Sequence, residues 1–479
     1  MDIATSWDFT LANYNGVWSF IVQFGLLLLF MLLGNILRNV VPFFRKCLIP
    51  SAIIGGTLLL LFNIFMKSIG FPVVNLRMMQ VFTYHCLGIG FAALTLKTEK
   101  ATVKAGKGQV LEFAAIQGGT YMLQAFVGLT VTILLFLFTK TGKQVISYIC
   151  GLILPLAYGQ GPGNALTWDI NFTNIPETQF AGNGSFGLSL ASIGFIVASV
   201  CGVLYINIFK RKGLLKTRDN IKYAKFNTDT EDTSSEIPDS ESIDKLTVQM
   251  CMVALSYAIA FAIMCGLAVL SDFTNSIGWG FNFMWAAIGA TLIKVCVRAL
   301  RKKNIMKRDY INNYQMDRIS GFAFDLMIVA GVAAIEINDI KNYILPVVVL
   351  SVVGCIITYV YIRLVAKHCF KGFEHEFFLM SFGTLTGTAS NGMILMKEID
   401  PYLITPTSSL YILSTFPAMI FVAPLLFLLK FAGSSFMNAC IACGIFFALW
   451  LVYTAILFRR KLFKKKYQNI PENVWVENE

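Results

Sequence analysis

Long apolar runs, separated by short polar loops, recur along the whole chain. Each run is close to the roughly 20 residues that cross the hydrocarbon core of a bilayer as a helix. The runs lie at residues 18–37, 48–66, 78–96, 110–138 and 186–209, at 248–270, 279–297, 319–337, 343–365 and 409–429, and at 437–458. The pattern predicts an all-α polytopic membrane protein, because only helices and closed barrels satisfy every backbone hydrogen bond inside lipid.

A further hydrophobic stretch, at residues 145–168, is interrupted. It starts with an apolar run too short to cross a bilayer and continues as LAYGQGPGNALTW. Its glycines lack side chains, and Pro162 lacks a backbone donor, so a regular helix cannot continue. A broken backbone at membrane depth is tolerated only where protein buries it or where it lines a watery cavity. The stretch therefore predicts a re-entrant hairpin that enters from outside.

A second interrupted stretch lies at residues 377–397 and contains the sequence SFGTLTGTASNGM. It predicts a re-entrant hairpin that enters from inside. Each half then has five spans with a hairpin between the fourth and the fifth, and because five is odd the second half is inverted. Two inverted five-helix repeats with paired broken segments are a known transporter plan, with sites near the membrane midplane.

This plan divides the chain into four predicted parts. A first transmembrane repeat occupies residues 1–212 and a polar cytoplasmic linker occupies 213–246. The inverted repeat follows at 247–431, and one extra C-terminal transmembrane helix with a basic tail occupies 432–479. The linker is rich in charged and hydroxyl side chains, which is typical of a flexible segment.

Composition agrees with a membrane protein, and the charge pattern predicts its orientation. Only 14% of residues are charged, against about 25% in a soluble protein. The net charge of +12 comes from basic residues that cluster in short loops beside the runs, which marks those loops as cytoplasmic. They form no patch on a soluble domain, so nucleic-acid binding is not indicated. No basic residue precedes Arg38, which argues against a cleaved signal peptide and places the N-terminus outside, with the basic C-terminus in the cytoplasm.

The broken segments supply the candidate binding groups. Helix N-termini at a break favour an anionic group, and unwound carbonyls and hydroxyls offer oxygen ligands to Na⁺. The predicted substrate-binding residues are Gly159, Gln160, Gly161, Gly163 and Asn164 in the first hairpin, and Thr386, Gly387, Thr388, Ser390 and Asn391 in the second. The predicted Na⁺ ligands are Ser381, Thr384 and Asp325, the last a carboxylate inside an apolar run. The alternative is that the small residues only allow close helix packing and that Asp325 lies at the membrane interface.

One loop carries other metal-binding residue types. His368 and His375 share it with Cys369, Glu374 and Glu376. A single short loop rarely supplies a full set of metal ligands. A solvated cytoplasmic loop is therefore the favoured interpretation.

Four segments resemble the bacterial glutamate:sodium symporter family. They read ICGLILPLAYGQGPGNALTW, FGLSLASIGFIVASVCGVLYINIFKRK, DRISGFAFDLMIVAGVAAIEI and FGTLTGTASNGMILMKEIDP. The resemblance implies two inverted repeats with re-entrant loops, a homodimer in the bacterial inner membrane, and Na⁺-coupled uptake of glutamate by elevator-like alternating access. The family's hairpin glycines correspond to Gly159, Gly161, Gly163, Gly383 and Gly387.

The predicted function is a Na⁺-coupled symporter that imports glutamate or a related anionic amino acid or carboxylate. A proton-coupled or exchange-type carboxylate transporter is the first alternative. A membrane-embedded glycan or lipid enzyme is the second, but no predicted external loop gathers the Arg, His and acidic residues that such an enzyme needs. A nucleotide-driven pump lacks its phosphate-binding motif here. No catalytic role is predicted.

Overall fold

The structure is a computed structural model of the whole chain. It describes residues 14–71, 73–97, 107–139, 146–215, 244–306, 310–401 and 405–462. These residues form helices and turns and contain no β-strand. Most of the predicted linker, the N-terminal segment before α1 and the basic tail after residue 462 lie outside the described residues.

The helices of the first half alternate in direction along the chain. They are α1 (Tyr14–Val40), α2 (Pro42–Lys46), α3 (Ser51–Ser68), α4 (Leu76–Leu96), α5 (Lys107–Thr139), η3 (Tyr148–Leu152), α6 (Ile153–Gln160), α7 (Pro162–Thr173), η4 (Pro176–Thr178) and α8 (Ser185–Arg211). The predicted break falls between α6 and α7. The second arm of that segment is longer than predicted, because α7 continues beyond residue 168.

The second half has two additional short helices, α10 and α13. Its elements are α9 (Lys245–Leu270), α10 (Asp272–Gly280), α11 (Asn282–Lys302), α12 (Asn313–Ala333), α13 (Ile337–Ile340), α14 (Ile344–Cys369), α15 (Glu374–Thr386), α16 (Ala389–Lys397), α17 (Thr407–Gly433) and α18 (Phe436–Leu462). The predicted run at 279–297 is divided at Phe281, between α10 and α11. The predicted run at 319–337 extends beyond the end of its helix, because α12 ends at Ala333.

Nine helices of the described chain are long and apolar enough to cross a membrane, or ten if the two parts of α17 form one span. Those parts meet at a bend of 52°, where Pro417 lacks the N–H that a continuous helix needs. The helix α12 is not among the nine, since it carries three charged residues, Asp317, Arg318 and Asp325. The surface is apolar where lipid would cover it: Val269, Val352 and Ile420 are each more than half exposed.

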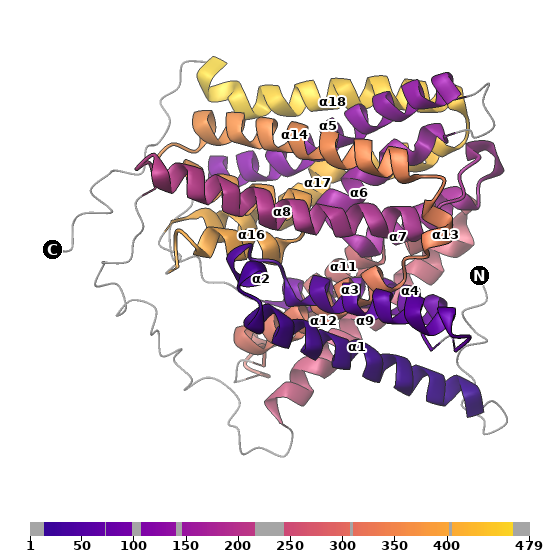
Figure 1. Cartoon of the computed structure of the whole chain (residues 1–479). Coiled ribbons are helices and arrows are strands. Elements are labelled where there is room, and N and C mark those ends of the chain that lie inside the picture. Colours follow the sequence, from indigo (N-terminus) through magenta and orange to yellow (C-terminus); the bar gives the residue numbers. More distant parts are fainter. Residues whose placement is uncertain are drawn as a thin grey trace.

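The helices pack into two bundles, and each bundle takes helices from both halves of the chain (Figure 1). The α4 bundle contains α1–α4 and α9–α12, and α4 against α12 is its most extensive contact. The α5 bundle contains α5–α8 and α14–α18, with α5 packed against α17 and α18. In Figure 1 the α5 bundle is the upper one, α1 begins at the right, and α18 ends at the left.

Candidate functional site

A cavity of about 110 Å³ lies between the two bundles. Residues of both helix breaks line it: Gly159 and Gln160 at the end of α6, Thr384 in α15, and Gly387 and Thr388 just after α15. The rest of its wall comes from α4, α11 and α12 on one side and from α5, α16 and α17 on the other. The fold therefore brings the interrupted segments of the two halves to one place.

The first break is held from two directions. Gly161 joins α6 to α7 with a φ of +83°, in the left-handed region that favours glycine. Tyr121 of α5 donates a hydrogen bond of 2.7 Å to the carbonyl oxygen of Gly159, and its ring fills the space where a side chain at 159 would project. Within the break, Asn164 Nδ2 donates to Gln160 Oε1 over 2.8 Å. Gly159 and Gly161 are thus required by packing and by backbone conformation.

The second break is also tied to α5. Gln124 Nε2 donates to the Leu385 carbonyl oxygen at 3.1 Å and to Thr358 Oγ1 at 2.8 Å. The two arms α15 and α16 pack backbone against backbone, since a Cβ added to Gly383 would lie 2.6 Å from Gly392 Cα. One helix, α5, therefore positions both breaks.

Four buried polar atoms near the breaks have no hydrogen-bond partner among the described residues. They are Asn164 Oδ1, Ser381 Oγ, Thr388 Oγ1 and Asn391 Nδ2. Buried polar atoms are nearly always paired, so such atoms mark places where a ligand, an ion or water can bond. The two breaks also touch: a Cβ on Gly161 would lie 3.7 Å from Thr388 Cγ2. Thr388 lies in the second break itself, and the other three unpaired groups lie on the helices that flank the two breaks, α7, α15 and α16.

Comparison with known proteins identifies the family. A family model described as the sodium/glutamate symporter matches residues 19–390, from α1 to the start of α16, and so includes both breaks. The chain belongs to the sodium/glutamate symporter family. This membership makes the protein a membrane transporter and implies coupling to sodium. No curated protein matches the chain.

The symporter brings some of the predicted site residues to the cavity and leaves others away from it. Of the predicted substrate-binding residues, Gly159, Gln160, Gly387 and Thr388 line the cavity, as does the predicted Na⁺ ligand Thr384. The predicted residues outside its wall are Gly161, Gly163, Asn164, Ser381, Thr386, Ser390, Asn391 and Asp325.

The residues outside the wall have different surroundings. Gly163 packs against Leu87, where a side chain would collide. Thr386 is fully buried, and its hydroxyl donates to the Phe382 carbonyl oxygen within its own helix. Ser390 and Asp325 are exposed at the protein surface. Asp325 is therefore turned away from the cavity that its helix helps to line.

Sequence reasoning missed several residues that line the cavity of the symporter. Gln117 and Tyr121 come from α5, and Tyr411 and Thr415 come from α17. Each lies in an otherwise apolar run, and Gln117 Nε2 donates to Ser414 Oγ of α17 over 3.1 Å. An amide or a phenol inside a membrane span was the available signal, since such groups need partners in lipid.

Asp169, near the end of α7, fixes the arm of the first break to α8. Its carboxylate is fully buried, and it accepts hydrogen bonds from the backbone N–H groups of Gly184, at 2.9 Å, and Gly187, at 2.7 Å. These donors belong to the N-terminus of α8, where helical N–H groups have no partner within the helix and a negative charge is favoured. The arm and α8 are therefore joined by a helix cap.

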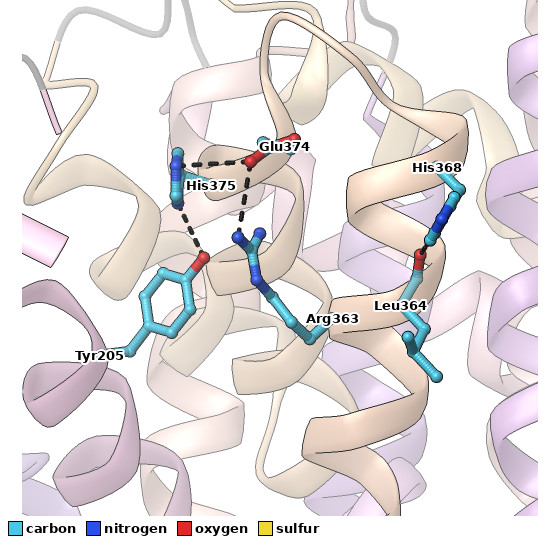
Figure 2. Close-up of polar contacts among 6 residues, drawn as sticks. All are labelled: Tyr205, Arg363, Leu364, His368, Glu374 and His375. Carbon is cyan, nitrogen blue, oxygen red and sulfur yellow. Dashed lines mark hydrogen bonds and ion pairs between the residues drawn. The ribbon is translucent and has the colours of Figure 1, made fainter. Parts of the chain in front are cut away.

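The predicted solvated loop after α14 is buried in part, whereas Lys371 and Gly372 within it are exposed. Cys369 and Glu376 are both buried, because α15 starts only a few residues after α14 ends and packs directly onto α8 and α14. The two histidines point to different partners (Figure 2): His375 Nδ1 lies 2.7 Å from Tyr205 Oη, and His368 Nδ1 lies 2.7 Å from the Leu364 carbonyl oxygen. The described residues contain no group of three His, Cys, Asp or Glu side chains that could hold a metal ion.

His375 belongs to a charged cluster at this end of α15. Glu374 Oε1 lies 3.5 Å from Arg363 Nη2 and 3.6 Å from His375 Nε2 (Figure 2). The guanidinium of Arg363 also lies over the ring of Tyr205, 5.7 Å from its centre. Burial, together with the positive charge of Arg363, lowers the pKa of His375, and the nearby Glu374 opposes this shift. The neutral imidazole therefore holds α15 to α8.

Proposed function

We propose that the protein imports glutamate, or a closely related anionic amino acid or carboxylate, together with Na⁺, and that both bind where the two helix breaks meet. The observation that carries this proposal is the convergence of both breaks on one cavity, together with four buried polar atoms, in or next to the breaks along the chain, that have no hydrogen-bond partner among the described residues. Family membership supplies the sodium and glutamate chemistry. The residue roles below are part of the proposal.

Helix ends supply the charge complementarity. The helices α7 and α16 begin at the breaks, so their N-terminal N–H groups attract a substrate carboxylate. The helices α6 and α15 end there, so their last carbonyl oxygens favour a cation. In this proposal Asn164, Thr388 and Asn391 bind substrate, and Ser381 and Thr384 contribute oxygen ligands to Na⁺. Asp325 is exposed, so its role requires a rearrangement of α12 or an indirect effect on the ion.

The coupling of substrate binding to Na⁺ binding follows from the lack of charged side chains in the cavity wall. None of the described residues that line it is Lys, Arg, Asp or Glu. A dicarboxylate there has only helix ends and a bound cation to balance it. Each unit of opposite charge at about 4 Å is worth about 4 kcal/mol at an effective dielectric constant near 20, so bound Na⁺ strongly favours substrate binding. Substrate and ion thus enter together.

The size of the cavity supports alternating access. Small-molecule sites usually enclose at least about 300 Å³, whereas this cavity encloses about 110 Å³. The two bundles must therefore separate before a substrate fits between them. In the proposed cycle the α5 bundle, which carries both breaks, moves against the α4 bundle as in an elevator. The α4 bundle is then the stationary part in the bilayer and, in a homodimer, the part that meets the second copy.

The packing supports two inverted repeats. The helices α1, α3 and α4 correspond to α9, α11 and α12, and α1 packs on α3 as α9 packs on α11. In the same way α5 and α8 correspond to α14 and α17, with one broken segment between each pair. In Figure 1 α7 lies toward the right and α16 toward the left, as expected if the hairpins enter from opposite sides. The N-terminus is proposed to be outside and the C-terminus in the cytoplasm, with α18 as an addition to the repeats.

Uptake into proteoliposomes tests the proposal. Labelled glutamate should accumulate with an inward Na⁺ gradient and not with an inward K⁺ gradient of equal size. Uptake that does not depend on Na⁺ and needs a proton gradient would establish the proton-coupled alternative. Uptake that does not depend on Na⁺ and needs an internal carboxylate would establish the exchange-type alternative. If glutamate neither enters the proteoliposomes nor competes with the uptake of another labelled carboxylate, glutamate is not the substrate.

Asn391→Ala tests the site itself. The loss of one hydrogen bond to a charged ligand, worth about 1.5–3 kcal/mol, should raise the KM for glutamate at least tenfold. Asn438→Ala in α18 is the matched control, because its amide bonds to Ser434 at the protein surface. Equal KM values for both variants and the unaltered protein would exclude Asn391 from the site.

A further inference from the structure

A second, larger cavity of about 560 Å³ lies beside the first break. Its wall is built by one face of α4, by α7 and by α10, so it also lies between the two bundles. Its volume is within the range of about 300–1,000 Å³ that small-molecule sites occupy. The helix α7 links it to the break: Thr167, in its wall, is five positions after Pro162, or about 7.5 Å along the helix axis.

The chemistry of the wall favours an anion. It contains the guanidinium of Arg77 and the imidazole of His85, and no described residue that lines it is Asp or Glu. The remaining polar wall is mainly neutral amides, among them Asn171 and Asn275. Such groups bind carboxylates and amino groups without adding negative charge. The cavity is thus electropositive and able to form many hydrogen bonds.

Among the described residues of the wall, Arg77 carries the positive charge. Arg77 is exposed, and its Nη1 lies 3.4 Å from Oε1 of the neutral Gln80, with no carboxylate within ion-pair distance among the described residues. Lys430, which does not line the cavity, donates from Nζ to Ser276 Oγ over 3.0 Å and to the carbonyl oxygen of Asp272, and the nearby carboxylate of Asp272 offsets its charge. Deeper in the cavity, His85 Nδ1 lies 2.9 Å from Tyr257 Oη, which fixes its ring.

We propose that this cavity is a recruiting site for the carboxylate substrate, with Arg77 as the charged group that captures it before it reaches the breaks. The proposal rests on the proposed function, since it supplies the substrate of the same site. On the proposed topology the cavity opens to the outside. A pocket of one charge sign raises the local concentration of an oppositely charged ligand and speeds its capture by about tenfold or more. Arg77 then acts in recognition and has no part in holding the substrate at the breaks.

The labelling rate of an introduced cysteine measures the charge of the cavity directly. Asn275→Cys places a thiol in the wall, and the purified protein in lipid nanodiscs exposes both faces to reagent. The ratio of the labelling rate with an anionic thiol reagent to that with a cationic one should be several-fold higher at Asn275→Cys than at Ser434→Cys. Ser434 is an exposed control position that follows α17. Adding Arg77→Gln should abolish this preference, and Arg77→Lys should retain most of it. The protein without an added cysteine corrects for its native thiols.

Ligand protection and transport kinetics complete the test. Glutamate should slow the labelling of Asn275→Cys, and glutamine, which lacks the side-chain carboxylate, should slow it much less. In proteoliposomes Arg77→Gln should raise the KM for glutamate several-fold while the maximal rate stays within about twofold.

The outcomes separate the two proposals. If Arg77→Gln leaves the charge preference unchanged, or if glutamate does not slow the labelling, the recruiting-site proposal is wrong even if Na⁺-dependent uptake is intact. Protection by glutamate in a protein that shows no Na⁺-dependent uptake keeps the anion site and overturns the proposed function.

Discussion

Replacing Gly392 with alanine perturbs the contact between the two arms of the second break. An added Cβ would collide with the carbonyl oxygen of Met380 and lie 2.5 Å from Thr384 Oγ1 and 3.1 Å from the backbone nitrogen of Thr384. Alanine in a helix interior is favoured over glycine by about 0.8–1 kcal/mol. Overpacking a closely packed position costs about 1–3 kcal/mol, and here two of the opposing atoms are backbone and cannot rotate away. The collision therefore outweighs the gain in helix propensity.

Because the two backbone atoms cannot move aside, the cost lies in the upper part of its range, at about 2–3 kcal/mol, and the net loss should be about 1–2 kcal/mol. This corresponds to roughly a tenfold effect on an equilibrium that needs α15 and α16 in register. We expect Gly392→Ala to fold, to melt at a lower temperature in detergent, and to raise the KM for glutamate about tenfold. Uptake into proteoliposomes at saturating Na⁺ measures the second effect, and thermal unfolding measures the first.

Gly444→Ala in α18 is the matched control. Apart from its own residue, its chain neighbours and the backbone of its own helix, no described heavy atom lies within 4 Å of the position that its Cβ would occupy. Only the helix-propensity gain remains there, so the control should melt at an equal or higher temperature with unaltered uptake. If Gly392→Ala behaves like Gly444→Ala in both assays, the close backbone packing of α15 and α16 does not determine the site, and the reasoning is refuted.

Three further predictions concern the supports of the two breaks. Tyr121→Phe removes the 2.7 Å hydrogen bond to the carbonyl group of the half-buried Gly159, a loss of about 1–3 kcal/mol, and should raise the KM about tenfold. Tyr453→Phe loses a 3.0 Å hydrogen bond to the Phe421 carbonyl oxygen and should leave the KM unaltered in the same uptake assay. Asp169→Ala leaves two N–H groups of α8 uncapped and should lower the unfolding temperature measured in detergent; an unaltered temperature would show that the cap is unimportant. The pKa of His375 lies below its usual value of 6.5, so the folded state favours the neutral ring. The stability of the folded protein is therefore undiminished by this residue above about pH 6.5 and declines as the pH falls below that value. Acidification from pH 7.5 to 5.5 should therefore destabilise the protein more than it destabilises His375→Gln, and equal pH profiles in thermal unfolding would contradict this.

The sequence by itself determined most of the membrane-spanning helices and the places where the two hairpin segments are interrupted. The hydrocarbon core accepts only long apolar helices, so their positions are directly visible as runs of about 20 residues. The break at Gly161 and Pro162 is equally local, because glycine conformation and the missing proline donor act on their own segment. The family resemblance depended on these same segments and is confirmed by the match to residues 19–390.

Only the tertiary structure decided which helices meet. In lipid an apolar side chain packs equally well against a helix or an acyl chain, so an apolar run does not encode its neighbours. Nothing in the sequence therefore indicated that α5 holds both breaks through Tyr121 and Gln124, or that Asp325 faces away from the cavity. The electropositive cavity around Arg77 was hidden for the same reason, since its wall combines helices from both halves of the chain.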